Sequence, residues 1–336
     1  MSENVPNVTV LIAARPEQVE VKAVAASRLL GYPADKVEII LARGKQPSAQ
    51  RNAGIKAATG ELIYFLDDDS LAPPENLRRG TLHFQDPEVQ MVGGPNICPL
   101  EAPFLEQIFA RVLSSKLAFG PSRARYTPVG QVRNTSEKEL ILCNLLARRQ
   151  ALLSLGGFNE ALYPNEENAL MDELQKRGGK LIYDPDFLVY RRPRSNLKSF
   201  AKMLMTYGRG RAEQFRLHPT FGSVLNFVPP LFVAYLIVAS IAAPLSRAWI
   251  ASLILAPLGV YTLLVLIEAL ALAFRSLPRS GTKVPSSDPL IGLASAPLIV
   301  LTHLLYGFGF WRGLFTTLHQ SQESRSTAVV LEKISK

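Results

Sequence analysis

The sequence predicts an α/β domain over residues 1–195, followed by an α-helical region that enters a membrane. Two observations carry this prediction. Up to about residue 218, short runs of Val, Ile and Leu alternate with longer stretches of helical spacing, which is typical of domains built on a parallel sheet. After that point, three long stretches contain almost no charged residue.

The composition excludes several classes of protein. Hydrophobic residues make up 48% of the 336 residues and charged residues 19%, unlike a disordered chain. Two cysteines, Cys98 and Cys143, are too few for a disulfide-stapled module, and four histidines leave little material for a zinc site. The net charge of +9 indicates an anionic partner. Because no helix-turn-helix, zinc-finger or RNP pattern is present, we expect a membrane surface or a phosphorylated substrate and no nucleic acid.

The N-terminal domain begins with strands and helices in alternation. Strands are expected at Val8–Ile12, Val37–Leu41 and Glu61–Leu66, and helices at Glu17–Leu30 and Ser48–Ala58. Parallel sheets of this kind bind ligands at the carboxyl ends of their strands. We therefore expect functional residues immediately after these strands.

Three aspartates, Asp67, Asp68 and Asp69, follow the third strand directly. Adjacent carboxylates repel one another, and burying them without a cation is costly. Alternate residues of an extended chain point the same way, so Asp67 and Asp69 can converge on one Mg²⁺ or Mn²⁺ ion. The alternative is an Asp-rich turn that caps the next helix, and the triplet by itself favours neither interpretation.

The N-terminal domain contains six short motifs in this order: Ile12–Glu17, Gln50–Ile55, Ala58–Glu61, Phe65–Asp69, Gly156–Glu160 and Asn165–Asn168. The ordered set resembles the inverting family 2 glycosyltransferases. The resemblance covers residues 8 to about 217, and the ordered set is specific although each motif alone is weak. It implies a GT-A fold, which is a Rossmann-like nucleotide-binding domain, together with a nucleotide-sugar donor, a divalent metal and a cytoplasmic active site.

The resemblance also implies roles for the acidic residues. Asp69 is expected to bind the metal directly, with Asp67 as a second ligand or as a contact to the donor sugar. The catalytic base falls on Glu167, the second acid of a pair at a helix start, where the family has aspartate. Its neighbour Glu166 is the alternative base. Helix capping would explain one of these acids without catalysis, because a carboxylate in the first turn is stabilised by the helix dipole.

Donor-binding residues are expected beside these acids. The family has an acid after its second strand that contacts the nucleotide base, whereas this chain has Leu41–Lys45 there, without an acid. Either the two cations of this segment bind the donor differently or backbone groups contact the base, and a UDP-sugar is the expected donor. Arg191 and Arg192 follow an expected strand at Leu181–Tyr190 and suit a diphosphate. The full expected set is Arg15, Arg43, Arg51, Asn52, Asp67, Asp68, Arg191 and Arg192.

The C-terminal region predicts membrane attachment. Residues 221–245, 248–274 and 289–311 are each long enough to span a bilayer as a helix. Within these spans Glu268 and His303 are polar, and we expect them to contact neighbouring helices or lipid headgroups. A proline pair, Pro229-Pro230, predicts a kink or break in the first span.

The loops predict an orientation. Ser246-Arg247 is short enough to make a tight hairpin of the first two spans, and the basic loop 275–288 favours the cytoplasmic side, together with the N-terminal domain. The third span would then carry the tail, residues 317–336, to the outside. Alternatively, the proline and glycines of this span make it re-entrant. A bacterial inner membrane is the expected location.

An amphipathic basic helix is expected at residues 196–218, before the transmembrane region at 219–316. Its mixture of apolar and basic side chains is typical of helices that lie at the level of the lipid headgroups. The segment Tyr207–Ala212 and the later proline pair resemble the membrane-bound succinoglycan-type glycosyltransferases, which extend lipid-linked oligosaccharides for exopolysaccharide.

The leading functional interpretation is an enzyme that moves one sugar from a nucleotide-diphosphate sugar to a lipid-linked, polyprenyl acceptor. One alternative is a processive polysaccharide synthase, although the Gln-x-x-Arg-Trp motif of such enzymes does not occur. Another is a polyprenyl-phosphate glycosyltransferase, which differs only in its acceptor. An alternative of another class is a catalytically silent membrane scaffold, which the missing base-contacting acid favours and the clustered acids oppose.

Overall fold

The structure is a computed structural model that describes residues 5–162, 165–217, 219, 221–275, 277–279, 282–286, 288–316 and 328–336. The chain divides into two compact units. We call the first the sheet unit; it consists of Met1–Pro99, Ala124–Arg192 and His319–Lys336. The second, the helical unit, consists of Leu100–Arg123 and Pro193–Leu318. Of the expected tail, residues 317–327 lie outside the described residues.

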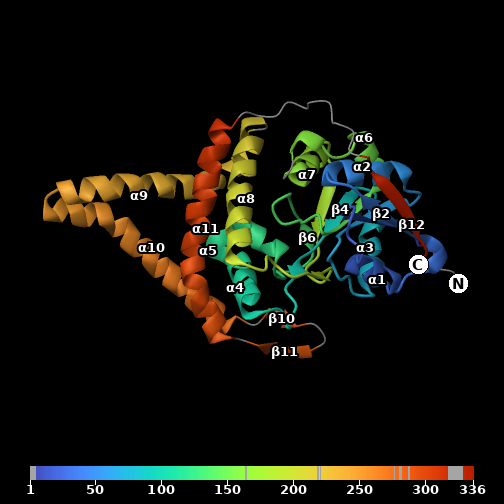
Figure 1. The fold of residues 1–336 in the computed structure, drawn as a ribbon, viewed down its shortest axis with the longest axis horizontal. Helices are drawn as coiled ribbons and strands as arrows, with labels where there is room; N and C mark the ends of the chain where they lie inside the picture. The colour runs from blue at the N-terminus through green and yellow to red at the C-terminus, as the bar shows by residue number, and fades with distance from the viewer. Residues whose placement is uncertain are drawn as a thin grey trace. The chain divides into compact units, whose positions relative to one another are not determined.

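An eight-stranded sheet forms the centre of the sheet unit (Figure 1). β1 pairs in parallel with β2 and β3, and β4 pairs in parallel with β8. β7 runs antiparallel between β3 and β4, and the edge strands β6 and β12 are also antiparallel to their neighbours. The predicted α/β class is confirmed, but the sheet is mixed rather than parallel throughout. From edge to edge the strands are β12 (Val330–Ile334), β2 (Val37–Arg43), β1 (Val8–Ala14), β3 (Leu62–Asp67), β7 (Asn144–Arg148), β4 (Val89–Gly93), β8 (Lys180–Tyr183) and β6 (Arg133–Asn134).

Alternate side chains of the central strands fill two apolar cores, one on each face of the sheet. Leu11 of β1 faces α2 (Pro47–Ala57), and its neighbours in the strand face the side of α1 (Lys22–Arg28). A methyl group at Gly54 would lie 2.2 Å from a Leu11 methyl carbon, so α2 packs closely on β1 only because this residue is glycine. By the same alternation, Asp67 at the end of β3 lies on the α2 face.

α1 begins at Lys22, later than the expected Glu17. The residues before it form a loop because Arg43 Nη1 donates hydrogen bonds to the carbonyl oxygens of Arg15 and Gln18, at 3.2 and 2.6 Å. The apolar residue that made this stretch resemble a helix, Val19, is 95% exposed. The other α-helices of the sheet unit are α3 (Asn76–Leu82), α6 (Arg149–Ser154) and α7 (Glu166–Lys176).

The expected strand at Leu181–Tyr190 is interrupted. It forms β8 and, after a turn, β9 (Val189–Tyr190), which pairs with β5 (Asn96–Ile97). The turn contains Asp184, whose buried carboxylate accepts hydrogen bonds from Arg79 and His83. Burial alone would raise the pKa of Asp184, but these hydrogen bonds outweigh burial and lower it.

The C-terminal strand β12 belongs to the same sheet as the N-terminal strands. It pairs antiparallel with β2, with Glu332 opposite Leu41 and Ile334 opposite Ile39 (Figure 1). Leu331 and Ile334 pack against the two cores. The end of the tail therefore lies in the same sheet as β1–β3. This pairing does not agree with the expectation that a third crossing carries the tail to the outside, away from the N-terminal domain.

The helical unit is made of α-helices and one short hairpin. Three of its helices are long and apolar enough to cross a membrane: Val224–Leu245, Ala248–Phe274 and Pro289–Phe315. Their limits are close to the predicted spans. The elements are α4 (Phe104–Leu113), α5 (Lys116–Phe119), α8 (Leu197–Leu217), α9 (Val228–Leu245), α10 (Ala248–Phe274), β10 (Leu277–Arg279), β11 (Thr282–Ser286) and α11 (Pro289–Phe315).

Proline has different effects in the apolar helices. A 3₁₀ helix at Phe221–Phe227 precedes α9, whose first turn contains Pro229 and Pro230, so the expected break is a change of helix type at that junction. α11 continues through Pro297 without interruption, and the structure therefore does not contain the break that a re-entrant third span would need.

The two polar residues of the spans bind the short helix α5. Glu268 Oε1 accepts hydrogen bonds from Ser115 Oγ at 2.8 Å and from the backbone N–H of Lys116 at 2.7 Å. A carboxylate in this position satisfies the open donors of a helix N-terminus. His303 hydrogen-bonds to the Tyr261 hydroxyl and, through its other ring nitrogen, to the carbonyl oxygen of Leu117. Both side chains make contacts between helices, as expected.

Candidate active site

Two of the three aspartates at the end of β3 converge on one arginine. Arg191, which follows β9, donates from Nε to Asp69 Oδ1 at 2.6 Å, and its Nη2 lies 3.2 Å from Asp67 Oδ2. Its backbone N–H is held by the carbonyl oxygen of Ile97, which fixes the segment beside β5. Asp68 has another part: its carbonyl oxygen accepts the N–H of Ala23 at the start of α1.

Arg51 connects this cluster to Glu166, one of the two acids among which the catalytic base is expected. It lies on the face of α2 toward the sheet and is 8% exposed. Its Nη2 donates to Asp67 Oδ1 and its Nη1 to Glu166 Oε1, both at 3.2 Å. The side chains of Glu166, Arg51, Asp67, Arg191 and Asp69 thus form a continuous line of alternating charge. We call these five residues the charge line.

Glu166 and Glu167 occupy the first turn of α7 but have different surroundings. Glu166 is 2% exposed, and its second oxygen accepts the N–H of Asn165 at 2.9 Å. Burial, and then the neighbouring charge of Glu167, raise the pKa of Glu166 to about 7, although Arg51 acts in the opposite direction. Glu167 is only half-buried. The pair therefore contains one acid held inside the fold and one whose side chain is partly open to solvent.

Asn52 joins two of the sequence motifs. Its amide donates to the carbonyl oxygen of Phe158 and to Glu160 Oε1, and its Oδ1 accepts the N–H of Phe158 at 2.8 Å. Gly157 has φ +84°, and a methyl group there would lie 2.4 Å from Asn52 Oδ1. The glycine is therefore required twice, for backbone conformation and for space. The structure uses Asn52, an expected donor-binding residue, to hold the loop that leads toward α7.

Arg43, another expected donor-binding residue, makes its hydrogen bonds with residues outside the charge line. Arg43 donates from Nε to Glu332 Oε1 of β12 at 2.6 Å, besides its two bonds to the loop before α1. Arg15 lies in that loop and is exposed, and Arg192 is exposed after Arg191. Glu332 is a site neighbour that sequence reasoning missed, because it lies 289 residues from Arg43 and no local pattern links the two.

The two converging carboxylates fit a hard divalent cation. In the described part of the chain, no group of three or more His, Cys, Asp or Glu side chains could hold a metal by itself. Mg²⁺ and Mn²⁺ sites that act on diphosphates, however, use one or two carboxylates and complete the shell with phosphate oxygens and water. Asp67 and Asp69 already share one positive group, the Arg191 guanidinium, so their oxygens are placed for a common cation.

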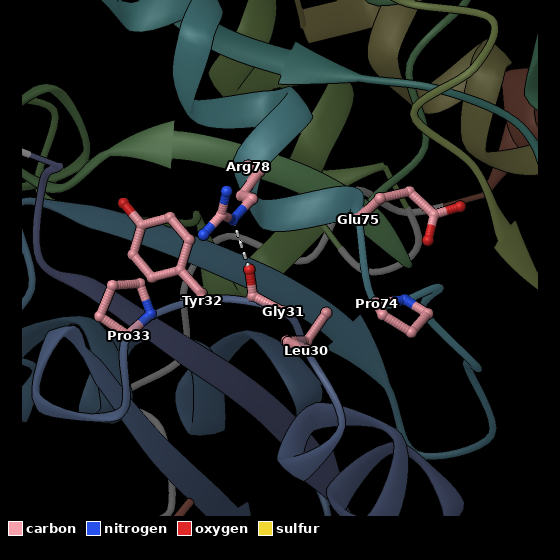
Figure 2. A pocket seen from close by; sticks show the side chains of 7 residues that line it. All are labelled: Leu30, Gly31, Tyr32, Pro33, Pro74, Glu75 and Arg78. Atoms are coloured by element: carbon pink, nitrogen blue, oxygen red, sulfur yellow. Dashed lines mark hydrogen bonds between the residues drawn. The ribbon is translucent and has the colours of Figure 1, made fainter. Parts of the chain in front are cut away.

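A shallow hollow of about 610 Å³ lies elsewhere in the sheet unit (Figure 2). Figure 2 shows Arg78 Nε donating to the Gly31 carbonyl oxygen at its centre. No member of the charge line contributes to its lining, so it is not our candidate active site. Its lining residues are Leu30, Gly31, Tyr32, Pro33, Pro74, Glu75 and Arg78.

Comparison with known proteins identifies the family. The sequence model described as "Glycosyltransferase like family 2" matches residues 1–206. The chain belongs to glycosyltransferase family 2. The match covers all five residues of the charge line, and the predicted family and enzyme class are confirmed.

Curated relatives of this glycosyltransferase match over part of their length. It is 30% identical to a "Pre-mycofactocin glycosyltransferase" of Mycobacterium tuberculosis over 64% of this chain and 44% of that protein. It is 29% identical to the "Succinoglycan biosynthesis protein ExoA" of Rhizobium meliloti over 60% of this chain and 54% of that protein. The chain thus spans about half the length of the curated relatives it matches.

The fold of this glycosyltransferase also resembles a solved structure. A mannosyltransferase from Pyrobaculum calidifontis, determined with GDP-Man and Mn²⁺, superposes with a TM-score of 0.57 over 93% of this chain and 88% of that one. The two sequences are 16% identical, so the likeness concerns the fold. It confirms the predicted GT-A-like α/β class.

Proposed function

We propose that this glycosyltransferase moves a single sugar, with inversion, from a nucleotide-diphosphate sugar to a lipid-linked acceptor at a membrane surface. The observation that carries the proposal is the charge line. It brings two metal-binding candidates, two arginines and the carboxylate of Glu166 into direct contact. A scaffold protein has no need for this arrangement, because like acids and a buried ion pair cost stability unless a cation or substrate uses them.

The donor diphosphate belongs at the Asp69 end of the line. Asp69 and Asp67 would hold Mg²⁺ or Mn²⁺, which when bound supplies positive charge to the departing diphosphate. Arg191, which lies between the two carboxylates, would release them to donate its N–H groups to phosphate oxygens, and Arg192 would add a second positive charge. Asp68 holds the start of α1 through its backbone, and we assign its side chain to the donor only through its place in the triplet.

We assign the base to Glu167. Both oxygens of Glu166 accept hydrogen bonds within the protein, and its side chain is enclosed, so it is poorly placed to receive a proton from a bulky acceptor. Glu167 follows on the same helix turn with a more open side chain. Glu166 then acts as a positioning residue, which ties α7 to Arg51 and the metal-binding acids.

The acceptor is proposed from the second half of the chain. Three helices that could cross a membrane, and the basic amphipathic helix α8 before them, suit an enzyme whose acceptor is itself embedded in lipid. We propose that residues 1–195 perform catalysis on the cytoplasmic side of a bacterial inner membrane and that residues 196–316 hold them there. A UDP-sugar is the first donor to test, although the second strand of this chain ends at Arg43, paired with Glu332, and lacks the acid that the family has after this strand.

The proposal is tested by nucleotide release from the purified protein in lipid nanodiscs. UDP- and GDP-sugars are compared with and without Mn²⁺, in the presence of a polyprenyl-diphosphate-sugar acceptor. We expect acceptor-dependent release of one nucleotide per product, with addition of one sugar by mass. Release that yields long polymer would indicate a processive synthase, and transfer to polyprenyl phosphate would indicate a polyprenyl-phosphate glycosyltransferase. No release with any donor, from protein that is folded, would support the scaffold.

A further inference from the structure

The position of β12 restricts how the apolar helices can meet a membrane. β12 follows α9, α10 and α11 in the chain, whereas β1, β2 and β3 precede them, yet all four strands lie in one sheet. A folded sheet lies on one side of a bilayer, since open sheet edges and loops do not occur in hydrocarbon. The chain therefore crosses the bilayer an even number of times. Three helices are long enough to cross, and so at least one of them does not.

α11 is the helix that is bound to a charged neighbour. It lies alongside α8 in the same direction: a methyl group at Gly309 would touch the Met205 backbone and one at Gly313 the Arg209 backbone. At Gly208 the added carbon would lie 2.1 Å from the Tyr306 carbonyl oxygen, so the two backbones are in contact. The glycines thus fix both helices at one depth over this stretch.

α8 cannot lie in hydrocarbon. It carries five basic side chains and Glu213, and a charged group at the centre of a bilayer costs several kcal/mol. Arg216 at its end donates to the carbonyl oxygen of Gly313, which ties it to α11 directly. The C-terminal half of α11 lies alongside α8, and this half is therefore at the level of the headgroups. The basic residues are Lys198, Lys202, Arg209, Arg211 and Arg216.

α9 and α10 form the exposed pair (Figure 1). α9 begins on the C-terminal half of α11, where Trp311 Nε1 donates to the Pro230 carbonyl oxygen at 3.0 Å. α10 ends on the other half, where a methyl group at Gly292 would lie 2.2 Å from the Ala273 Cα. Between these points the two helices leave α11 and meet at the turn before Ala248.

Burial and length agree with this division. In the apolar stretch of each candidate span, the share of residues buried within the protein is 17% for the span that contains α9, 6% for α10 and 39% for α11. With a rise of ~1.5 Å per residue, α9 is about 27 Å long and α10 about 40 Å. The hydrocarbon core of a bilayer is ~30 Å thick. α9 together with the turn before it can therefore cross this core, and α10 can cross it when tilted. The turn between them contains Arg247, which suits the far headgroup layer.

We propose that α9 and α10 cross the membrane as a hairpin and that α11 lies beside α8 in the plane of the near headgroup layer. α11 therefore contacts the headgroup layer of the lipid, although the composition of this helix alone resembles that of a third span. The number of crossings between β1 and β12 is then two, and both strands are on the same side of the bilayer.

The depth of α11 is measured with spin labels at exposed sites in a Cys98→Ser background, in vesicles of phosphatidylethanolamine and phosphatidylglycerol. Leu293→Cys and Phe308→Cys lie on α11, 15 residues apart. In a crossing helix these labels would differ in depth by about 22 Å. We expect both to be shallow and within a few ångströms of one another. The matched control is Leu253→Cys and Leu264→Cys on α10, which we expect to differ clearly in depth.

Sidedness is measured with a membrane-impermeant maleimide on sealed vesicles. We expect Lys333→Cys in β12 to react from the same side as Val19→Cys in the sheet unit, and Arg247→Cys to react from the opposite side. The proposal is overturned if the two α11 labels differ in depth like a spanning helix. It is equally overturned if Arg247→Cys reacts from the side of Val19→Cys. Neither measurement depends on sugar transfer, so the outcome is separate from that of the proposed function.

Discussion

Arg51 Nη1 donates a hydrogen bond to Glu166 Oε1 at 3.2 Å, and both side chains are almost fully buried. Removing one partner of a buried ion pair leaves an uncompensated charge, which typically costs ~3–5 kcal/mol unless the remaining group changes its protonation. This ion pair also connects α2 to α7. The Arg51 side chain thereby links the proposed metal-binding acids to the two acids at the start of α7.

We expect Arg51→Met to lower the melting temperature and to reduce turnover by at least ~10-fold, because Asp67 and Glu166 both lose their cation. Melting and turnover of the single variants Arg51→Met and Glu166→Gln are compared with those of the double variant. If the contact matters, the double variant is more stable than the sum of the single losses predicts. Arg177→Met, on an exposed pair at the end of the same helix, is the control.

Glu167→Gln tests the base. The amide keeps the size of the side chain but cannot accept a proton, and general base catalysis contributes ~10²–10⁴-fold, so turnover should fall by about that factor. Donor affinity, measured by nucleotide-sugar binding, should hardly change. Glu166→Gln is the matched variant. A dead Glu166→Gln beside an active Glu167→Gln would assign the base to Glu166, and full activity of both would leave the pair as a helix cap.

The pH dependence of stability should report Glu166. Its pKa is about 7 in the folded state against 4.5 for a solvent-exposed glutamate, so the native state binds the proton more tightly than the unfolded state. The associated stabilisation is complete below pH ~4.5 and is lost as the pH rises toward 7. We therefore expect the melting temperature of the native protein to fall relative to that of Glu166→Gln across this interval and to run parallel above it. Parallel curves throughout would contradict the raised pKa.

Asp69→Asn tests the metal assignment. Asparagine retains one oxygen but not the charge, and a metal that stabilises a leaving diphosphate supplies several kcal/mol, so turnover should fall by ~10²-fold or more. The Mn²⁺ concentration needed for half-maximal donor binding should rise as well, which is measured without turnover. Asp35→Asn, at an exposed acid in the sheet unit, is the control. Unchanged Mn²⁺ dependence in Asp69→Asn would remove the residue from the metal site.

The C-terminal strand gives a graded prediction. The Arg43–Glu332 pair is partly exposed, with 18% and 43% of the side chains accessible, so Glu332→Gln should cost at most ~1 kcal/mol. Truncation after residue 327 removes Leu331 and Ile334 from the two cores and exposes the edge of β2, which should cost ~2–4 kcal/mol and promote aggregation. Thermal melting and light scattering measure both. Equal stability of the truncated and full chains would show that β12 contributes nothing.

Local sequence predicted the elements that depend on neighbouring residues. The first three predicted strands begin within one residue of the observed starts of β1, β2 and β3. Their positions could be predicted because each is a short run of apolar residues bounded by turn signals. The position of the acids followed from the end of β3. α1 was predicted too long because its first residues are held as a loop by Arg43, a residue on another strand.

The remaining features depend on long-range packing. The charge line joins Arg51 to Glu166 across 115 residues, so the motif suggested that each residue matters without indicating that they touch. Likewise, the period of an apolar helix does not distinguish a span from α11, whose depth depends on the backbone of α8. The pairing of β12 with β2 has no local signal at all.

The place of β12 in the sheet also affects when the protein can become complete. Residues 330–334 leave the ribosome only after all three helices that could cross a membrane have been made. The edge of β2 therefore remains unpaired throughout synthesis of the membrane region, and Arg43 has no carboxylate partner in β12 during that time. The sheet is thus completed only after the apolar helices have been made, and a chain that stops before β12 would keep an open strand edge at β2.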